Sequence, residues 1–379
     1  MKKQSRTLVD TASKGLMVWM MASSQAFAFS LISHDGVPAR WAEGKSVEIE
    51  IDTDFTPYID REGCDMEGVC QSIYSTVKKS IDAWKNVSNT KINISNITTK
   101  SISETPHYDG KNQIKMYDQG WSNLPFNPPA SALAVTISTY TNPNTIVDSD
   151  IFFNAQNFQW AVINSDAEYN QYDIENVLTH EIGHFLGLDH TSEDSSEHEA
   201  PYVDATMFFA SRPGEVFRRT LEQQDILGIQ HLYDATGMPA PIVDEISPNN
   251  LQINSQTETI EIFGSDFYPT TSVIIVRNNE LGDINARIIA VESDRILAKI
   301  PVSSLQSGEY ELVVANSYDS FVRLESSLTV ENPYLAGTYD HKAASTSSSG
   351  GCQSSNPSSI FLMLLPLLGM IAIRRLRLQ

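Results

Sequence analysis

The sequence predicts an α+β domain with a twisted mixed sheet and long helices, followed by a smaller all-β sandwich. Up to about residue 236, segments with the alternating pattern of strands are interspersed with segments that have the spacing of amphipathic helices. At 237–248 prolines cluster and helical periodicity disappears, which marks a domain boundary. Beyond it, short β-type segments separated by turn residues continue for about 90 residues, which is typical of a sandwich.

The first domain is predicted to open with a strand and a helix. Residues 47–52 alternate apolar and polar side chains, which predicts a half-buried strand. Apolar residues recur at helical spacing over 67–87, which predicts an amphipathic helix with its apolar stripe in the core. Further strands are predicted at 91–94, 113–116, 132–139 and 146–153.

The strongest helix pattern covers residues 173–186. Gly187 follows it and ends the helix, because glycine tolerates the left-handed conformation at a helix C-terminus. A later helix is predicted over 221–233, with a capping box at 220–223. Strands of the second domain are predicted at 259–263, 272–276, 295–300 and 309–314.

The chain carries a net charge of −21, although both of its ends are basic. So acidic a surface argues against nucleic acid or anionic lipid as a partner. Residues 1–28 are typical of a secretory signal peptide, with a basic start, an apolar run and the cleavage motif Ala26-Phe27-Ala28. Because the apolar run is too short for a membrane anchor, we expect export and a mature chain that begins near Phe29.

The sequence contains three cysteines. In an oxidising compartment, Cys64 and Cys70 could close a small disulfide loop. A thiol that masks a metal is the alternative for this pair. The third, Cys352, lies next to Gly350-Gly351 in the C-terminal tail and could be a processed or modified residue.

Residues 180–190 read His-Glu-Ile-Gly-His-Phe-Leu-Gly-Leu-Asp-His. Two histidines four positions apart lie on one helix face, so His180 and His184 can present ring nitrogens to one metal ion. Gly187 breaks the helix, and the chain can then turn so that His190 supplies a third nitrogen. Three protein ligands leave one position open, which is the arrangement of a catalytic zinc rather than a structural one.

Glu181 is the predicted general base. It lies one residue round the helix from the first ligand, where a carboxylate can accept a proton from water. A bare His-Glu-x-x-His occurs by chance in unrelated proteins, whereas the longer form with a third histidine is much rarer. The alternative is a helix with surface histidines. Apolar residues at 174, 177 and 178 argue against it, because they bury the helix and place its metal face at the wall of a cleft.

This motif resembles that of the metzincin family, and within it the matrixins, over roughly residues 38–236. Residues 150–154 are similar to the matrixin strand before the active-site helix. Residues 205–208 are similar to the Met-turn, and residues 224–233 are similar to the closing helix. The resemblance implies that the three histidines bind one catalytic Zn²⁺ and that Glu181 is the base. It further implies that Met207 supports the site without binding the metal.

The resemblance also implies how a peptide substrate binds. An extended peptide would pair with an edge strand within residues 130–139. Phe208, Phe209 and their neighbours would form the wall of the primed-side pocket.

The chain departs from animal matrixins in two respects. Neither a cysteine-switch pro-segment nor the histidine-rich segment for a second, structural zinc is recognised, and His107 and Asp109 are the nearest candidates for that zinc. Ca²⁺ could bind in the acidic loop at 191–204 or near Asp148 and Asp150, since hard cations need several oxygen ligands. A solvated acidic loop is the alternative.

Residues 241–332 resemble the immunoglobulin-like TIG or IPT family, through turn and core motifs such as Ile-Phe-Gly-Ser-Asp-Phe at 262–267. The resemblance implies a spacer or a binding module without catalytic residues. A Ser/Gly-rich linker at 333–359 follows. The tail at 360–379, apolar and then rich in arginine, resembles bacterial sorting tails of the Gly-Gly type. Its apolar part would span about 21 Å as a helix, so a retained membrane anchor is the alternative.

We therefore expect a secreted or cell-surface zinc endopeptidase that hydrolyses extracellular proteins or peptides, exported in a Gram-negative bacterium. One alternative is a non-catalytic surface adhesin with a degenerate peptidase domain. Another is a metal-dependent hydrolase with a substrate other than peptides. Zinc content together with chelator-sensitive cleavage of a generic protein separates these classes.

Overall fold

The computed structural model describes residues 29–55, 73–103, 105, 108–141, 144–163, 170–194, 196–277 and 283–333. The predicted signal peptide, disulfide and sorting tail lie outside these ranges, as does His107. No helix within them is long and apolar enough to cross a membrane.

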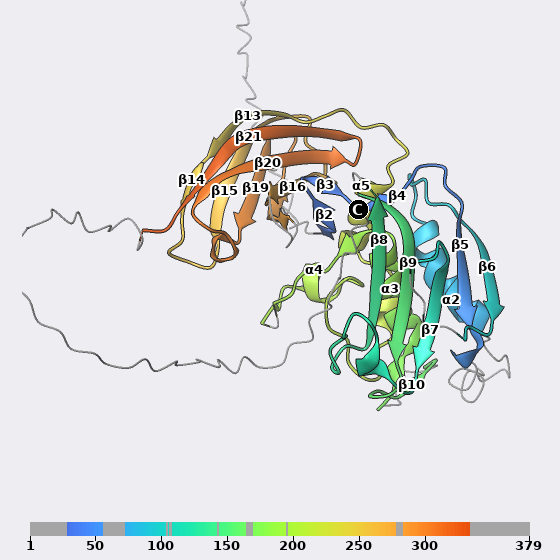
Figure 1. Cartoon of the computed structure of the whole chain (residues 1–379). Coiled ribbons are helices and arrows are strands. Elements are labelled where there is room, and N and C mark those ends of the chain that lie inside the picture. The colour runs from blue at the N-terminus through green and yellow to red at the C-terminus, as the bar shows by residue number, and fades with distance from the viewer. Residues whose placement is uncertain are drawn as a thin grey trace, which may run out of the picture.

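The first domain is built on a six-stranded mixed sheet (Figure 1). Its order is β4-β9-β7-β5-β6, and β8 pairs with β9. All neighbours are parallel except β8, which is antiparallel to β9 and is an edge strand among the described residues. The strands are β4 (Arg40–Trp41), β5 (Val47–Asp52), β6 (Ile94–Lys100), β7 (Asn112–Tyr117), β8 (Ala134–Thr141) and β9 (Thr145–Asn154).

Most of the predicted strands are confirmed, but the one predicted at 91–94 is wrong. The strand β6 begins at Ile94, because the preceding stretch is held elsewhere: the amide of Lys91 donates to the carbonyl of Tyr233 at 2.8 Å. The side chains after Ile94 are mostly exposed, since β6 lies at the other edge of the sheet. Its polar sequence therefore lacks the alternation that marks the neighbouring strands.

The sheet is covered on both faces. Ile151 and Phe153 face the main core, which α2 (Ile73–Lys85) and α3 (Ile174–Phe185) share. Phe152 points the other way, into a small cluster around Trp121. This explains the uninterrupted apolar run in β9, because a strand buried on both faces needs no polar side.

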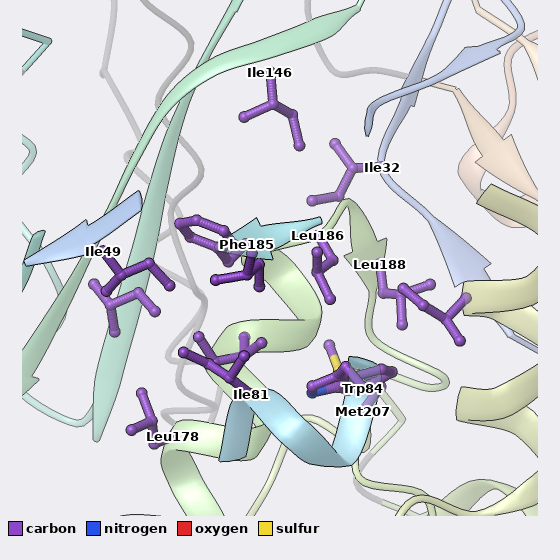
Figure 2. Close-up of a cluster of buried hydrophobic side chains, with 14 of the residues drawn as sticks. Ile32, Ile49, Ile81, Trp84, Ile146, Leu178, Phe185, Leu186, Leu188 and Met207 are labelled. Carbon is purple, nitrogen blue, oxygen red and sulfur yellow. The ribbon is translucent and has the colours of Figure 1, made fainter. Parts of the chain in front are cut away.

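The helix α3 passes through the centre of the domain, and all of its side chains are buried. The indole of Trp84 on α2 donates to the carbonyl of Thr179 at 2.9 Å and so ties the two helices together. Figure 2 shows Trp84 beside Met207, and both lie next to Gly183 of α3. The predicted helix at 67–87 is described only from Ile73, and it ends at Lys85.

The helix α5 (Gln223–Leu232) closes the domain. The capping box predicted at 220–223 is wrong by two positions. Glu222 is the N-cap, and its partner is Asp225, whose carboxylate accepts the Glu222 amide at 2.9 Å. The same carboxylate accepts the amides of Thr206 and Met207 at 2.8 and 3.0 Å, so one side chain caps the helix and fixes the turn at 205–208.

Short elements connect these parts. They are β1 (Ser30–Leu31), β2 (Ser33–His34), β3 (Val37–Pro38), β10 (Trp160–Ala161), β11 (Tyr172–Asp173), β12 (Leu188–Asp189), α4 (Ala200–Val203), and the 3₁₀ turns η1 (Thr53–Phe55), η2 (Trp121–Asn123), η3 (Phe217–Arg219) and η4 (Val302–Ser304). In Figure 1, β2 and β3 lie between the two domains.

The second domain consists of two sheets, β13-β15-β19-β18 and β14-β21-β20-β16-β17, around a shared apolar core. The four predicted strands fall within β15, β16, β19 and β20. The bounds are β13 (Ile242–Ser247), β14 (Asn250–Gln252), β15 (Glu258–Ser265), β16 (Ser272–Val276), β17 (Ile284–Asn285), β18 (Arg287–Val291), β19 (Arg295–Ile300), β20 (Gly308–Ser317) and β21 (Ser320–Glu331). Its immunoglobulin-like TIG classification stays a prediction.

The two domains share buried surface. Ile274 and Val276 of β16, with Val313 and Ala315 of β20, belong to the main core cluster of the first domain. Apolar burial of this kind stabilises docking, since it removes hydrophobic surface from water.

Candidate active site

Local structure places the three histidines at one point. Asp173 caps α3, because its carboxylate accepts the amide of Asn176 at 2.7 Å. The helix then carries His180 and His184 on one face and ends at Phe185. Gly187 follows with a φ of 106°, which only glycine adopts readily. A Cβ at Gly187 would overlap the carbonyl of Ala39, so the sharp turn that returns the chain to His190 requires glycine.

The Nε2 atoms of the three histidines face one another. The distance from His184 Nε2 to each of the other two is 3.1 Å, and His180 Nε2 lies 3.3 Å from His190 Nε2. Tetrahedral ligands about 2.0–2.1 Å from a zinc ion lie roughly 3.3 Å apart, so the spacing fits that ion.

The opposite ring nitrogens all have partners. His180 Nδ1 bonds the carbonyl of Thr206 at 2.7 Å, and His184 Nδ1 bonds that of Leu188 at 2.8 Å. A carbonyl only accepts, so these Nδ1 atoms carry the protons. His190 Nδ1 lies 2.6 Å from the carboxylate of Glu193. In their neutral rings the Nε2 atoms of His180 and His184 are therefore unprotonated. The three Nε2 atoms meet in one buried spot, where a cation would stabilise their lone pairs.

Burial keeps the first two ligands neutral. Desolvation, reinforced by the other site histidines, lowers the pKa of His180 well below its ordinary value. Desolvation and the neighbouring His190 lower the pKa of His184 to about 3. His190 is equally desolvated, yet its hydrogen bond to Glu193 raises its pKa overall. Neutral imidazole is the form that binds a metal, so the electrostatics suit His180 and His184 to ligation at neutral pH.

Glu181 lies beside the three histidines and is 2% exposed. One carboxylate oxygen, Oε2, accepts a hydrogen bond from the hydroxyl of Thr136 at 2.5 Å. Burial raises the pKa of Glu181 to about 7, against the opposing effect of the Thr136 hydrogen bond. A carboxyl group with a pKa in this range can both accept and release a proton near neutrality.

A cavity of about 170 Å³ opens at this site. Its lining includes His180, Glu181, Phe208 and Phe209, together with residues 131–134 at the start of β8. The rings of Phe208 and Phe209 lie 4.8 Å apart at its wall, and their role in a primed-side pocket stays a prediction. Since liquid water occupies about 30 Å³ per molecule, the cavity has room for several waters or for one side chain.

Met207 is 1% exposed. It follows Thr206, whose carbonyl holds the His180 ring. Its sulfur occupies the space beside Gly183, where a Cβ would overlap it. The sulfur thus lies against the helix that carries His180 and His184, and the supporting role of Met207 stays a prediction.

Sequence reasoning missed two residues of this site. Thr136 is 45 positions from Glu181, and no local pattern links them. Glu193 was interpreted only as part of an acidic loop, although its position three residues after the third ligand was a usable signal.

Among the described residues, no group of three carboxylates converges in a way that suggests calcium. The two groups with metal-binding spacing are the three histidines and Asp189-His190-Glu193. Asp194 instead accepts from Ser196, and Asp148 accepts the amides of Asp109 and Gly110. Calcium binding stays a prediction.

Comparisons with known proteins place the first domain. Residues 65–234 match the family model described as Matrixin. No curated protein matches the chain. Members of this family use zinc, in agreement with the histidine group.

Solved structures give short matches. A protein of unknown function from Bacteroides thetaiotaomicron is 17% identical over 26% of this chain and 23% of its own, with a TM-score of 0.21. The TIG domain of human nuclear factor of activated T-cells, cytoplasmic 4, is 14% identical over 23% of this chain and 84% of its own, with a TM-score of 0.20. An auxiliary nutrient binding protein from Bacteroides ovatus is 13% identical over 24% of this chain and 21% of its own, with a TM-score of 0.18.

The chain thus spans less than a quarter of the first and third of these proteins. Scores this low support no argument about fold or function. The match of residues 65–234 to the Matrixin model supports a metzincin-like peptidase domain in this part of the chain.

Proposed function

We propose that this protein is an exported zinc endopeptidase that hydrolyses peptide bonds of extracellular proteins. The observation that carries the proposal is the convergence of three Nε2 atoms, 3.1–3.3 Å apart, beside a buried carboxyl group at the wall of a cavity. The signal-peptide pattern at 1–28 supports export.

The residues present account for hydrolysis. His180, His184 and His190 would hold the zinc ion. When bound, that ion supplies positive charge that polarises the scissile carbonyl and acidifies water. Glu181 accepts the proton of the attacking water and then delivers it to the leaving amine, for which its raised pKa suits it. Thr136 orients the Glu181 carboxyl group through its hydrogen bond.

The edge strand β8 is the proposed site for the substrate backbone. Its described pairing is with β9 alone, and it starts at the cavity that contains Glu181. An extended peptide could add to this edge through main-chain hydrogen bonds. The side chain after the cleaved bond would then enter the cavity between Phe208 and β8.

The test is peptide-library profiling with wild type beside Glu181→Gln. The variant keeps the three histidines, so we expect it to bind zinc as wild type does and to lose nearly all cleavage. Cleavage by Glu181→Gln at the wild-type rate would show that another group is the base. Absence of cleavage by zinc-loaded wild type would favour the adhesin alternative.

A further inference from the structure

The loop that carries the third ligand is held by the second domain. This third-ligand loop comprises residues 187–194 and 196–204, and it ends with α4. In Figure 1, α4 lies on the side of the first domain that faces the β-sandwich. Arg287, the first residue of β18, reaches across this interface.

Arg287 makes three contacts with the loop. One guanidinium nitrogen, Nη1, lies 2.6 Å from the carboxylate of Glu197, and Nη2 lies 2.9 Å from that of Glu199. The guanidinium carbon lies 3.7 Å from the ring centre of Tyr202. The Glu197 side chain is only 5% exposed and Tyr202 is 1% exposed, whereas Arg287 itself is 31% exposed, so two of its three partners are buried. A planar guanidinium can pair with carboxylates and stack on a ring at the same time, which an ammonium cannot.

Tyr202 transmits this contact toward His190. Its backbone carbonyl accepts the hydroxyl of Thr191 at 3.2 Å, and the Thr191 amide donates to the carbonyl of Met207 at 3.0 Å. Thr191 directly follows His190. The part of the loop after the third ligand is therefore linked to Arg287 by one continuous set of contacts.

The part of the loop before His190 is linked to the same region of the sandwich. The N-terminal strand β1 pairs with β12, Ser30 with Asp189 and Leu31 with Leu188. The side chain of Asn285, two residues before Arg287, makes two hydrogen bonds with the Leu31 backbone. Its Nδ2 donates to the Leu31 carbonyl at 2.9 Å, and its Oδ1 accepts from the Leu31 amide at 3.3 Å. Residues on both sides of His190 are thus fixed through β17 and β18.

We propose that Arg287 is a positioning residue for the third metal ligand, and that the β-sandwich therefore acts in building the metal site of the peptidase domain. The proposal rests on the proposed function. Arg287 is neither a metal ligand nor a residue that lines the cavity. It restricts the loop, so that His190 is already in place when the ion binds. Preorganisation of this kind raises affinity because less ordering accompanies binding.

The test compares the zinc dissociation constants of the full chain and its variants. Removing a direct hydrogen-bond partner of a metal ligand typically weakens metal binding by 10–100-fold. Arg287 acts through the loop and not on His190 itself, so we expect Arg287→Ala to weaken zinc binding by up to about tenfold and to lower kcat/KM by a similar factor. Arg287→Lys retains one positive charge, so its zinc affinity should lie between those of wild type and Arg287→Ala. Hydrogen exchange at 196–204 should be faster in Arg287→Ala, which is a readout independent of activity.

Arg40 offers a matched control. It also crosses the domain interface, with Nη2 3.1 Å from the carboxylate of Asp319 and its guanidinium 3.6 Å from the ring centre of Tyr318. Within the described residues, none of its side-chain hydrogen bonds, ion pairs or ring contacts is with the third-ligand loop. We expect Arg40→Ala to bind zinc within roughly twofold of wild type, since distant sites act independently.

Equal loss of zinc affinity in the Arg40 and Arg287 variants would show that domain docking in general, not Arg287, is responsible. Unchanged affinity in folded Arg287→Ala or Arg287→Lys would overturn the proposal as well. If wild type itself binds no zinc and cleaves no peptide, the proposed function fails instead, so the two failures are distinct.

Discussion

The hydroxyl of Thr136 on the edge strand donates a 2.5 Å hydrogen bond to the carboxylate of Glu181 on the central helix. The same hydroxyl lies 3.2 Å from the Glu181 backbone carbonyl. Thr136 is buried, so no water competes for this bond. The strand that is proposed to hold the substrate thus also orients the proposed base.

Thr136→Val should lower turnover and leave zinc binding intact. Valine fills the same volume but cannot donate, and a hydrogen bond to a charged group contributes about 1.5–3 kcal/mol. If half of this is expressed in the transition state, kcat falls by about 3- to 12-fold. Thr139→Val is the control, because Thr139 is buried on the same strand but faces the opposite side of the sheet. Equal rates for the two variants would remove Thr136 from the mechanism.

Gly183→Ala should destabilise the first domain. The added Cβ would overlap the sulfur of Met207 and lie 2.9 Å from Cζ2 of Trp84. Overpacking of this kind costs about 1–3 kcal/mol, which exceeds the roughly 1 kcal/mol that alanine gains over glycine in a helix. Thermal unfolding measures the loss.

A double variant locates the clash. Met207→Ala also destabilises, because it leaves a cavity, but it removes the closest of the overlaps that the new Cβ would make. Gly183→Ala with Met207→Ala should therefore cost less than the sum of the two single changes. Simple additivity would show that Met207 does not fill the space beside Gly183.

His231 should make the protein less stable in acid. It is fully buried on α5, where Nδ1 donates to the carbonyl of Thr270 at 2.9 Å and Nε2 has no partner among the described residues. Burial lowers its pKa to about 4, whereas an unfolded histidine has a pKa near 6.5. Between these values the unfolded chain binds a proton that the native chain does not, so stability falls as the pH decreases through this window.

The contribution of His231 is measured by difference. His231→Gln has no titrating ring, and other groups titrate alike in both proteins. Between pH 7 and pH 4 the variant should lose less stability than wild type, by an amount on the order of 3 kcal/mol at about 1.4 kcal/mol per pKa unit. Urea unfolding at the two pH values gives the comparison. Equal losses of stability in wild type and His231→Gln would mean that His231 is not buried in its neutral form at the domain interface.

Prediction from sequence succeeded where one segment carries the whole signal. The apolar run of β9 and the helix of His180 and His184 are both local patterns, and Gly187 marked the turn that makes the third ligand possible. It failed at β6, an edge strand whose exposed side chains show no alternation. Hydrophobic periodicity reflects the burial of one face of a strand. It therefore gives no signal where a strand is hydrogen-bonded into a sheet but its side chains are exposed.

The missed parts of the site depend on contacts between distant segments. Thr136 meets Glu181 only because the sheet lays β8 against α3. Arg287 meets Glu197 only because two domains dock. Charge composition predicted an acidic loop at 191–204, but not that its carboxylates bind a histidine and an arginine. Such pairs are set by tertiary structure, and one sequence contains no pattern that links them.

The most direct test of this account is anomalous X-ray diffraction at the zinc absorption edge from crystals of the zinc-loaded chain. We predict one peak bound by Nε2 of His180, His184 and His190, each at about 2.0–2.1 Å, with Glu181 beside it but not bound. A peak that lacks His190 among its ligands, or no peak at the three histidines, would contradict the account.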